Sequence, residues 1–254
     1  MTENRILEDT LIFEKNNNIS GGIYHKMQID FAYNSNHIEG SWLSHEQTRY
    51  IFETHSIEGA AFVNDVFEAS NHFKCLDFIL DTVNKPLTEE YVKKLHYTLK
   101  NGLMTSSNSE IVIGDYKKYA NVIGEIETAK PEEVHRLMTM LVENPDFYDI
   151  AEFHMEFEKI HPFYDGNGRV GRLLILKMCL ENNIVPFFIN EENKLFYYIG
   201  LKEWQMNNKA NRLLDVFLSM QDDMKRILDY FEIEYDNSEI NYRELIEKHY
   251  KQTL

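Results

Sequence analysis

Along most of the chain, apolar side chains recur every three or four residues, which is the spacing of one face of an α-helix. This pattern predicts a helix over residues 24–39, and Gly40 is a suitable residue to end it. Ser44 with Gln47 forms a capping box, which predicts the start of a second helix. A longer helix is predicted over residues 60–82. Its expected buried face consists of Phe62, Val66, Phe67, Phe73, Leu76 and Ile79.

The same periodicity continues in the second half of the chain. Further helix starts are predicted at Thr88 and at Pro131, and Asp149 with Glu152 forms a second capping box. Residues 169–181 are apolar on nearly all sides, which is typical of a central, fully packed helix.

One stretch departs from the helical pattern. Residues 111–124 have β-branched and aromatic side chains around polar turn residues, which predicts a short β-hairpin. The final segment, residues 222–254, is amphipathic and predicts a helical extension, with an apolar side that consists of Ile227, Leu228, Tyr230 and Phe231. Eleven glycines and five prolines in 254 residues are few, which favours long helices over many short strands. We therefore expect a helical protein with one small β-hairpin, in one large domain or two small ones.

The composition limits the classes of partner. Asp plus Glu total 42 against 26 Lys plus Arg, so the formal net charge is −16, and we expect no binding to nucleic acid or to a membrane. No apolar run reaches the roughly 18 residues that a membrane span needs. The polar N-terminus lacks the apolar stretch of a signal peptide, and Cys75 and Cys179 lie in apolar helical patterns typical of buried free thiols. These features favour a cytoplasmic protein.

The candidate chemistry lies between two predicted helices, in the segment HPFYDGNGRVGR at residues 161–172. Gly166 and Gly168 allow the backbone to present N–H groups to an anion where a helix begins. Arg169 and Arg172 lie one turn apart on that helix start, and two guanidinium groups there suit a polyphosphate.

Two further side chains of this segment suit group transfer. Asp165 supplies the hard oxygen ligand that Mg²⁺ on a nucleotide prefers. His161 titrates near neutral pH and can take a proton from a hydroxyl. His154 lies two helical turns earlier, but no third metal ligand is evident, so the sequence favours a packed or hydrogen-bonded histidine over a metal pair.

Residues 161–172 resemble the Fic motif, H-P-F-x-[D/E]-G-N-G-R-x-x-R, at every fixed position. The resemblance extends from about residue 24 to about residue 221. It implies the Fic fold in a single domain, residues 1–254. This fold is an all-α helical bundle with a small β-hairpin called the flap, here at about residues 111–125. It also implies an adenylyltransferase that transfers AMP from ATP, with Mg²⁺, to a Ser, Thr or Tyr hydroxyl of a protein target, which can be the protein itself.

The resemblance implies a role for each residue of the motif. His161 is the implied general base, and Asp165 is the implied Mg²⁺ ligand. The implied phosphate contacts, which include an anion hole and the Asn167 amide group, come from Asp165, Gly166, Asn167, Gly168, Arg169 and Arg172.

Outside the motif, the flap is implied to align the protein target as an added strand. Lys117 stands on the flap where relatives often have Arg, a departure that puts little in doubt. Residues 194–201 resemble the segment on the adenine side of the family's nucleotide site. The implied ATP contacts in these two regions are Val122, Ile123, Gly124, Tyr197 and Tyr198.

Residues 35–40 resemble the inhibitory motif of Fic proteins, [S/T]-x-x-x-E-[G/N], with Ser35, Glu39 and Gly40 at its fixed positions. Ser35 and Glu39 are four residues apart and project from one face of the predicted helix. The resemblance implies that Glu39 pairs with Arg172 and keeps this arginine from the γ-phosphate. An inhibitory helix at about residues 24–40, N-terminal to the core, is the class II arrangement of the family.

Other functions stay open at this point. The same pocket, with Glu39 and a metal, can serve the removal of AMP from a modified protein. The domain can also be a regulatory module that binds nucleotide without turnover, although the intact His161 and Asp165 disfavour this, and Gly166 disfavours a kinase-like relative. The expected partners are ATP and a protein target that docks at the flap. The sequence leaves open a homo-oligomer, the identity of the target and the signal that relieves inhibition.

Overall fold

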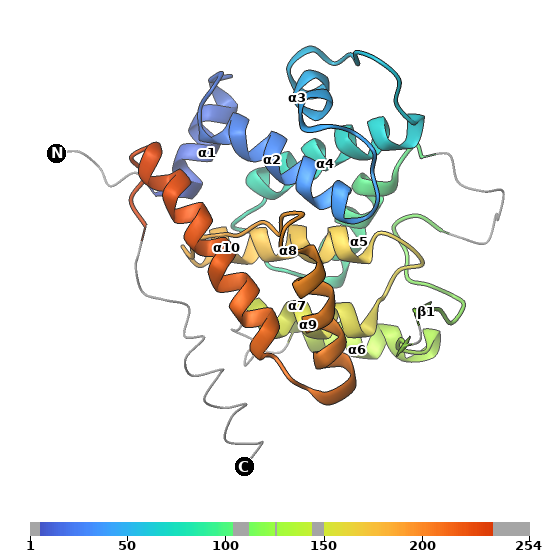
Figure 1. The fold of residues 1–254 in the computed structure, drawn as a ribbon. Coiled ribbons are helices and arrows are strands. Elements are labelled where there is room, and N and C mark those ends of the chain that lie inside the picture. The colour runs from blue at the N-terminus through green and yellow to red at the C-terminus, as the bar shows by residue number, and fades with distance from the viewer. Residues whose placement is uncertain (1–5, 104–111, 125, 144–149, 236–254) are drawn as a thin grey trace.

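The structure, a computed structural model, describes residues 6–103, 112–124, 126–143 and 150–235 (Figure 1). Within these ranges it has ten helices and one two-stranded sheet, which confirms the all-α fold class. The helices are α1 (Leu7–Asn16), α2 (Ile23–Ile38), α3 (His45–Thr54), α4 (Val63–Asp81), α5 (Glu89–Lys100), α6 (Pro131–Glu143), α7 (Ile150–Ile160), α8 (Asn167–Glu181), α9 (Lys194–Asn207) and α10 (Asn211–Tyr230).

The end of α2 and the start of α3 carry the local signals that the sequence predicted. Helix α2 ends at Ile38, Glu39 caps it, and Gly40 follows with a φ of 98°. This left-handed backbone is strained for residues that carry a Cβ atom, so glycine suits the stop. The capping box before α3 is confirmed, since the Ser44 and Gln47 side chains each bind the other residue's backbone N–H. These stops fix the point at which Glu39 leaves α2.

The predicted buried face of α4 is only partly correct. Phe73, Leu76 and Ile79 are buried, but Phe62 is 64% exposed and Phe67 is 42% exposed. Phe62 precedes the first helical residue and therefore does not share a face with the helix. Phe67 is rotated by about 100° from its neighbour Val66, which does pack on the core formed by α2, α3 and α4.

Helix α8 lies at the centre of the bundle (Figure 1) and packs against α2, α4, α5 and α7. All residues from Arg169 to Leu180 are buried, as the apolar pattern predicted. Even Lys177 is buried, and its ammonium group donates to the Val83 carbonyl and to Glu181. A polar group in such a position needs a partner. The same requirement applies to Arg169 and Arg172 at the start of α8, where the predicted site lies.

The hairpin is shorter and later in the chain than the sequence predicted. Strand β1 (Val122–Ile123) pairs in antiparallel register with β2 (Ile126–Glu127). Residues 112–121 form turns and irregular backbone instead of a strand. The predicted hairpin residues 111 and 125 lie outside the described residues.

The backbone that was predicted as the first strand is bound to its neighbours instead. The Lys117 N–H donates to the Pro162 carbonyl at 2.9 Å. The Gly114 N–H donates to Nδ1 of His96 at 3.0 Å. Because these donors are used by α5 and by the loop after α7, this segment does not pair with a second strand.

The predicted C-terminal extension is helical at its start. Helix α10 runs past residue 222 to Tyr230, with Leu228 buried as expected. Tyr230, which was expected on the apolar side, is 81% exposed. The rest of the extension, from residue 236, and the predicted cap Asp149 lie outside the described residues.

Both cysteines lie in the hydrophobic core. Cys75 and Cys179 are both buried and free, which confirms the prediction. Among the helices that the structure describes, none is long and apolar enough to cross a membrane.

We predict that His72 gives the fold part of its pH dependence. His72 is fully buried beside Phe31, and burial lowers its pKa to about 3. Between about pH 6.5 and pH 3 the unfolded chain binds a proton that the folded protein does not, so stability is lost as the pH falls through this window. His72→Leu should lower the slope of unfolding free energy against pH by up to about 1.4 kcal/mol per pH unit.

Urea unfolding at several pH values measures this slope. His55→Asn is the matched control, because His55 is exposed and its left-handed backbone suits asparagine. Equal slopes in wild type and His72→Leu would contradict the assignment.

Candidate active site

A tight loop between α7 and α8 brings residues 161–166 to the N-terminus of the central helix. Gly166 caps α8 with a φ of 83°. The Asn167 side chain holds the loop, since its Oδ1 accepts from the Phe163 N–H at 2.8 Å and its Nδ2 donates to the Phe163 carbonyl at 2.9 Å. With both ends of this amide bound, the N–H groups of the first turn of α8 are the donors available to an anion.

His96 on α5 packs against this loop. Its ring stacks on the Phe163 ring, with centroids 3.8 Å apart and planes inclined by 5°. Its Nε2 lies 3.1 Å from the carbonyl oxygen of Asp165, and its Nδ1 accepts from the Gly114 N–H. One imidazole therefore ties the loop both to α5 and to the segment that leads into the flap.

His161 follows directly on α7 and takes a left-handed backbone, with a φ of 52°. Its side chain is 19% exposed. Burial, together with the nearby Lys117 ammonium group, lowers the pKa of His161 to about 4. The imidazole is therefore neutral at pH 7, which is the state that accepts a proton.

Asp165 is bound by cations at the end of the loop. Its Oδ2 accepts from Lys100 Nζ at 2.5 Å, and its Oδ1 accepts from the Gly166 N–H at 2.7 Å. Glu68 on α4 lies between Lys100, at 3.2 Å, and Arg169, at 2.5 Å. Burial alone would raise the pKa of Asp165, but Lys100 and Arg169 outweigh it and hold this pKa below its usual range. The carboxylate is therefore ionised at neutral pH.

The donors at this position fit Mg²⁺ bound together with a nucleotide. The Asp165 side chain is 62% exposed and ionised. Within the described ranges, no group of three or more His, Cys, Asp or Glu side chains gathers to hold a metal ion by itself. Mg²⁺ is commonly held by one or two carboxylates plus substrate phosphates and water, so a single carboxylate suffices when phosphates complete the shell.

Arg172 is buried and bound by α2 and its cap. One terminal nitrogen donates to Glu39 Oε1 at 2.7 Å and to the Ser35 carbonyl at 2.9 Å, and Nε donates to the Ser35 hydroxyl at 3.1 Å. Gly168 permits this approach, because a Cβ atom there would lie 2.3 Å from Glu39 Oε1. Burial would raise the pKa of Glu39, but Arg172 and Arg169 outweigh it and lower this pKa. The ion pair that the inhibitory motif implied is present.

Arg169 is held in the same way by two other elements. It is 3% exposed and binds Glu68 of α4 at 2.5 Å and the Asn36 Oδ1 of α2 at 3.4 Å. Asp165 lies 3.8 Å away, at the edge of ion-pair distance. Both arginines at the start of α8 therefore have protein partners where the sequence predicts phosphate contacts.

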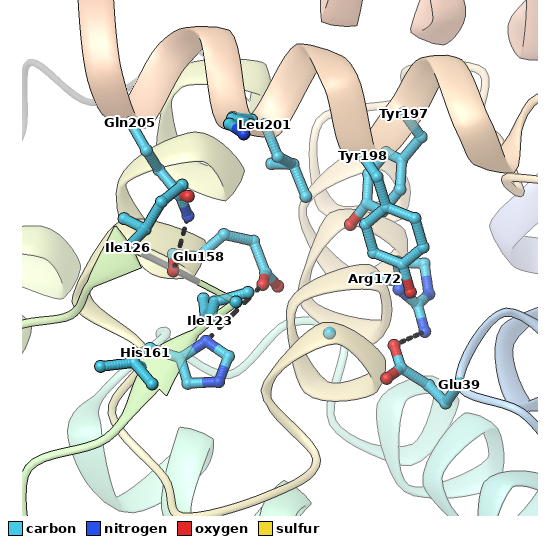
Figure 2. A pocket seen from close by; sticks show the side chains of 14 residues that line it. Glu39, Ile123, Ile126, Glu158, His161, Arg172, Tyr197, Tyr198, Leu201 and Gln205 are labelled. Carbon is cyan, nitrogen blue, oxygen red and sulfur yellow. Dashed lines mark hydrogen bonds and ion pairs between the residues drawn. The ribbon is translucent and has the colours of Figure 1, made fainter.

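A pocket of about 630 Å³ opens beside these groups, a volume in the range of small-molecule sites. Figure 2 shows His161 and Glu158 on one side of it, Arg172 and Glu39 on the other, and α9 above. The predicted site residues that line the pocket are Glu39, Val122, Ile123, Gly124, His161, Gly168, Arg172, Tyr197 and Tyr198. The predicted site residues that do not line it are Ser35, Gly40, Asp165, Gly166, Asn167 and Arg169.

The two tyrosines differ in their surroundings, although both come from α9. Tyr197 is fully buried, and its hydroxyl lies 2.8 Å from Nε2 of His154. His154 is thus a buried, hydrogen-bonded histidine, as favoured by the sequence. Tyr198 is 41% exposed, and its hydroxyl donates to the Ile38 carbonyl at the end of α2. Nucleotide contacts by either tyrosine stay a prediction.

Four polar residues of the site were not predicted, namely Glu68, His96, Lys100 and Glu158. Glu68, His96 and Lys100 lie between 65 and 101 residues before the groups that they bind within residues 161–172, a separation that gives no sequence signal. Glu158 could have been found, because it precedes His161 by three residues on the same helix.

Comparisons with known proteins agree with the fold and with the motif. Residues 86–179 match the family model of the Fic/DOC family. The chain is 25% identical over 183 residues to the protein adenylyltransferase Fic of Nematostella vectensis and 27% identical over 186 residues to that of Drosophila grimshawi, in each case over 67% of this chain.

The structure resembles the crystal structure of a Fic domain containing signaling protein from Bacteroides thetaiotaomicron. The TM-score is 0.68 at 25% sequence identity, over 86% of this chain and 92% of that one. The match to the two curated relatives spans only 42% and 36% of their length. Their similarity therefore concerns the region around the site and not the whole of those proteins.

We predict that Lys100 neutralises the carboxylates around Asp165. Lys100→Met leaves Glu68 and Asp165 with Arg169 as their one remaining cation among the described residues, so the free energy of unfolding should fall by about 1–3 kcal/mol. Millimolar Mg²⁺ should then raise the melting temperature of the variant more than that of the wild type, because a divalent cation can replace the lost charge. Thermal unfolding with and without Mg²⁺ measures both effects.

Lys94→Met is the control, since Lys94 lies on the exposed side of the same helix. The same loss of stability in both variants, with no difference in the response to Mg²⁺, would show that Lys100 has no special role.

Proposed function

This chain carries a Fic domain, and on that premise we propose that it is a protein adenylyltransferase held in an autoinhibited state. It transfers AMP from ATP to a Ser, Thr or Tyr hydroxyl of a protein target, which can include the protein itself. The observation that carries the proposal is one pocket that holds both a neutral, half-buried His161 and the start of α8 with Arg172. A proton acceptor beside a polyphosphate site is what transfer of a nucleotidyl group requires.

The chemistry follows from the positions of these groups. The acceptor hydroxyl attacks the α-phosphorus of ATP, the new O–P bond forms, and the bond to pyrophosphate breaks with its electron pair leaving on pyrophosphate. His161 takes the hydroxyl proton. The N–H groups at the start of α8 and the arginines of that helix bind the phosphate oxygens. Nearly all of this catalysis is positioning and stabilisation of charge.

Mg²⁺ is the proposed cofactor. Asp165 would hold it together with the phosphates of ATP, and the ion would neutralise charge on the departing pyrophosphate. The support for this assignment is the ionised, exposed Asp165 carboxylate at the end of the loop.

Glu39 is the proposed inhibitor. Its carboxylate binds the guanidinium of Arg172, which the γ-phosphate of ATP would otherwise occupy. An ATP molecule that lacks this contact would not align its α-phosphate with His161. The short strand β1 of the flap borders the same pocket through Val122 and Ile123, and a target chain would add to this strand so that its hydroxyl faces His161.

Removal of AMP from a modified protein is the second candidate. It is favoured by one observation, namely that the Glu39 carboxylate lines the same pocket as His161. Glu39 would orient a water molecule toward the phosphorus and take its proton as the new O–P bond forms. The bond from phosphorus to the protein oxygen would break, and a protonated His161 would give its proton to that oxygen. In this reaction Glu39 is a participant and not an inhibitor.

Incubation of wild type and of Glu39→Gly with α-labelled ATP, Mg²⁺ and cell lysate distinguishes the two candidates. Label on proteins with Glu39→Gly supports AMP transfer. Loss of label from pre-modified proteins with wild type, but not with Glu39→Gly, supports AMP removal.

We predict that Glu39→Gly raises AMP transfer strongly and that Arg172→Ala does not. Either change breaks the ion pair, but only the first leaves Arg172 free for the γ-phosphate. The first change also leaves a buried guanidinium without its partner, so the melting temperature should fall without ATP and recover with Mg·ATP. Labelled-ATP transfer and thermal unfolding of the same samples measure both. Equal transfer by wild type and Glu39→Gly would exclude the inhibitory role of residues 35–40.

We predict that His161→Ala, made in the Glu39→Gly variant, lowers the rate of AMP transfer by about 10²–10⁴. Because His161 acts on the hydroxyl, the dissociation constant for ATP should change little, and calorimetry measures this constant. His135→Ala, at an exposed position on α6, is the control. Transfer at an unchanged rate in the His161 variant would remove this residue from the mechanism.

A further inference from the structure

Glu158 on α7 is a buried carboxyl group that the proposed reaction leaves without a role. It precedes His161 by three residues, lines the pocket and is 4% exposed. Its Oε2 lies 4.0 Å from Nδ1 of His161, and Figure 2 shows the two groups facing each other. Within the described residues its Oε1 has no hydrogen-bond partner. A buried polar atom in this state costs stability, so packing alone does not account for it.

Three elements surround this carboxyl group. On α8, Gly171 leaves it room, because a Cβ atom there would lie 2.6 Å from Oε1. On α9, Gln205 Nε2 donates to the Glu158 backbone carbonyl at 3.3 Å and holds the end of α7. On α7 itself, Glu158 shares the helix end with His161. The packing of these helices therefore places the carboxyl group beside the imidazole.

The charges around Glu158 come from several elements. Burial raises its pKa to about 8, Arg172 on α8 opposes this rise, and Glu39 at the end of α2 adds to it. The other titratable groups near the pair are His154 on α7, Tyr197 and Tyr198 on α9, Asp165 on the loop before α8, and Lys117 before the flap. The carboxyl group is therefore protonated at pH 7 and ionises within the range of ordinary assays.

The geometry separates the two ring nitrogens of His161. Nδ1 faces Glu158, which leaves Nε2 as the nitrogen that can accept a proton from a hydroxyl in the pocket. Hydrogen bonds between catalytic groups are often long before substrate binds and shorten in the complex. When Glu158 is ionised it can act only as an acceptor at Nδ1, which selects the tautomer with Nε2 unprotonated and stabilises the imidazolium that forms.

We propose that Glu158 is a positioning residue for His161, which it aligns through Nδ1 and whose basicity it raises when it is ionised. The inference rests on the proposed AMP transfer. In the reaction the hydroxyl proton moves to Nε2, the O–P bond forms, the P–O bond to pyrophosphate breaks, and the imidazolium donates from Nδ1 to Glu158. His161 then returns its proton to water, so one proton is released for each AMP transferred.

The test compares Glu39→Gly with Glu39→Gly/Glu158→Gln over pH 6.5–9. Below the pKa of Glu158 an acid and an amide are alike, so the two values of kcat should agree within about twofold. As Glu158 ionises, only the carboxylate makes His161 more basic, so the ratio should rise to about tenfold. KM for ATP should not change. A role in folding alone, or none, predicts a ratio that does not depend on pH, and this result would overturn the proposal.

Two further variants keep the result interpretable. Glu158→Asp retains a titrating carboxyl group at a greater distance, so its pH-dependent rise should be present but smaller. Glu152→Gln, near the start of the same helix, should behave as the parent. The titration of an acceptor tyrosine would raise the rates of all variants alike and would cancel in the ratios.

Nitrogen-15 NMR of the His161 ring tests the pairing without any activity. In wild type the Nδ1 resonance should shift as Glu158 ionises near pH 8, and in Glu158→Gln it should not. This shift in a protein that transfers no AMP would refute the proposed function and leave the pairing intact. Its absence would refute the pairing even in an active enzyme.

Discussion

Two guanidinium groups, those of Arg169 and Arg172, are buried where α8 begins, and each needs an anion close by. The central position of α8 makes them inaccessible to water, and a buried charge without a partner costs several kcal/mol, about 3–5. Glu68 meets this need for Arg169, and Glu39 with Ser35 meets it for Arg172. The packing of α2 and α4 against α8 is therefore coupled to the charge balance of the site.

On the proposed function, this charge balance would allow the site a second set of partners. The phosphates of a nucleotide would supply the negative charge that Glu39 supplies in the structure, so nucleotide and Glu39 would compete for Arg172. Such a competition would link the end of α2 to the pocket. Tyr198, which donates to the Ile38 carbonyl from α9, adds a further contact at the same end of this helix.

The acidic groups of the pocket differ in protonation because their surroundings differ. Arginines hold the pKa of Glu39 low, whereas burial raises the pKa of Glu158 to about 8. Burial and Lys117 lower the pKa of His161 to about 4, so its imidazole is neutral at pH 7. Groups of the same chemistry with pKa values driven apart are typical of sites that transfer protons.

The sequence by itself determined those features that depend on neighbours within a few turns. The helix stop at Gly40, the capping box at Ser44 and the central character of residues 169–181 follow from local backbone preference and from periodicity. The motif at residues 161–172 likewise contains its loop, glycines and arginines within one short, continuous segment of the chain.

The tertiary structure alone decided which groups these residues meet. Lys100 and Glu68 reach Asp165 and Arg169 across separations of 65 and 101 residues, which no local pattern encodes. The tertiary structure also set the extent of the hairpin. The Lys117 N–H donates to the Pro162 carbonyl, so it is not available to pair with a second strand. The physical reason is that burial and electrostatic pairing depend on distances in space, which the chain sets only when its helices pack.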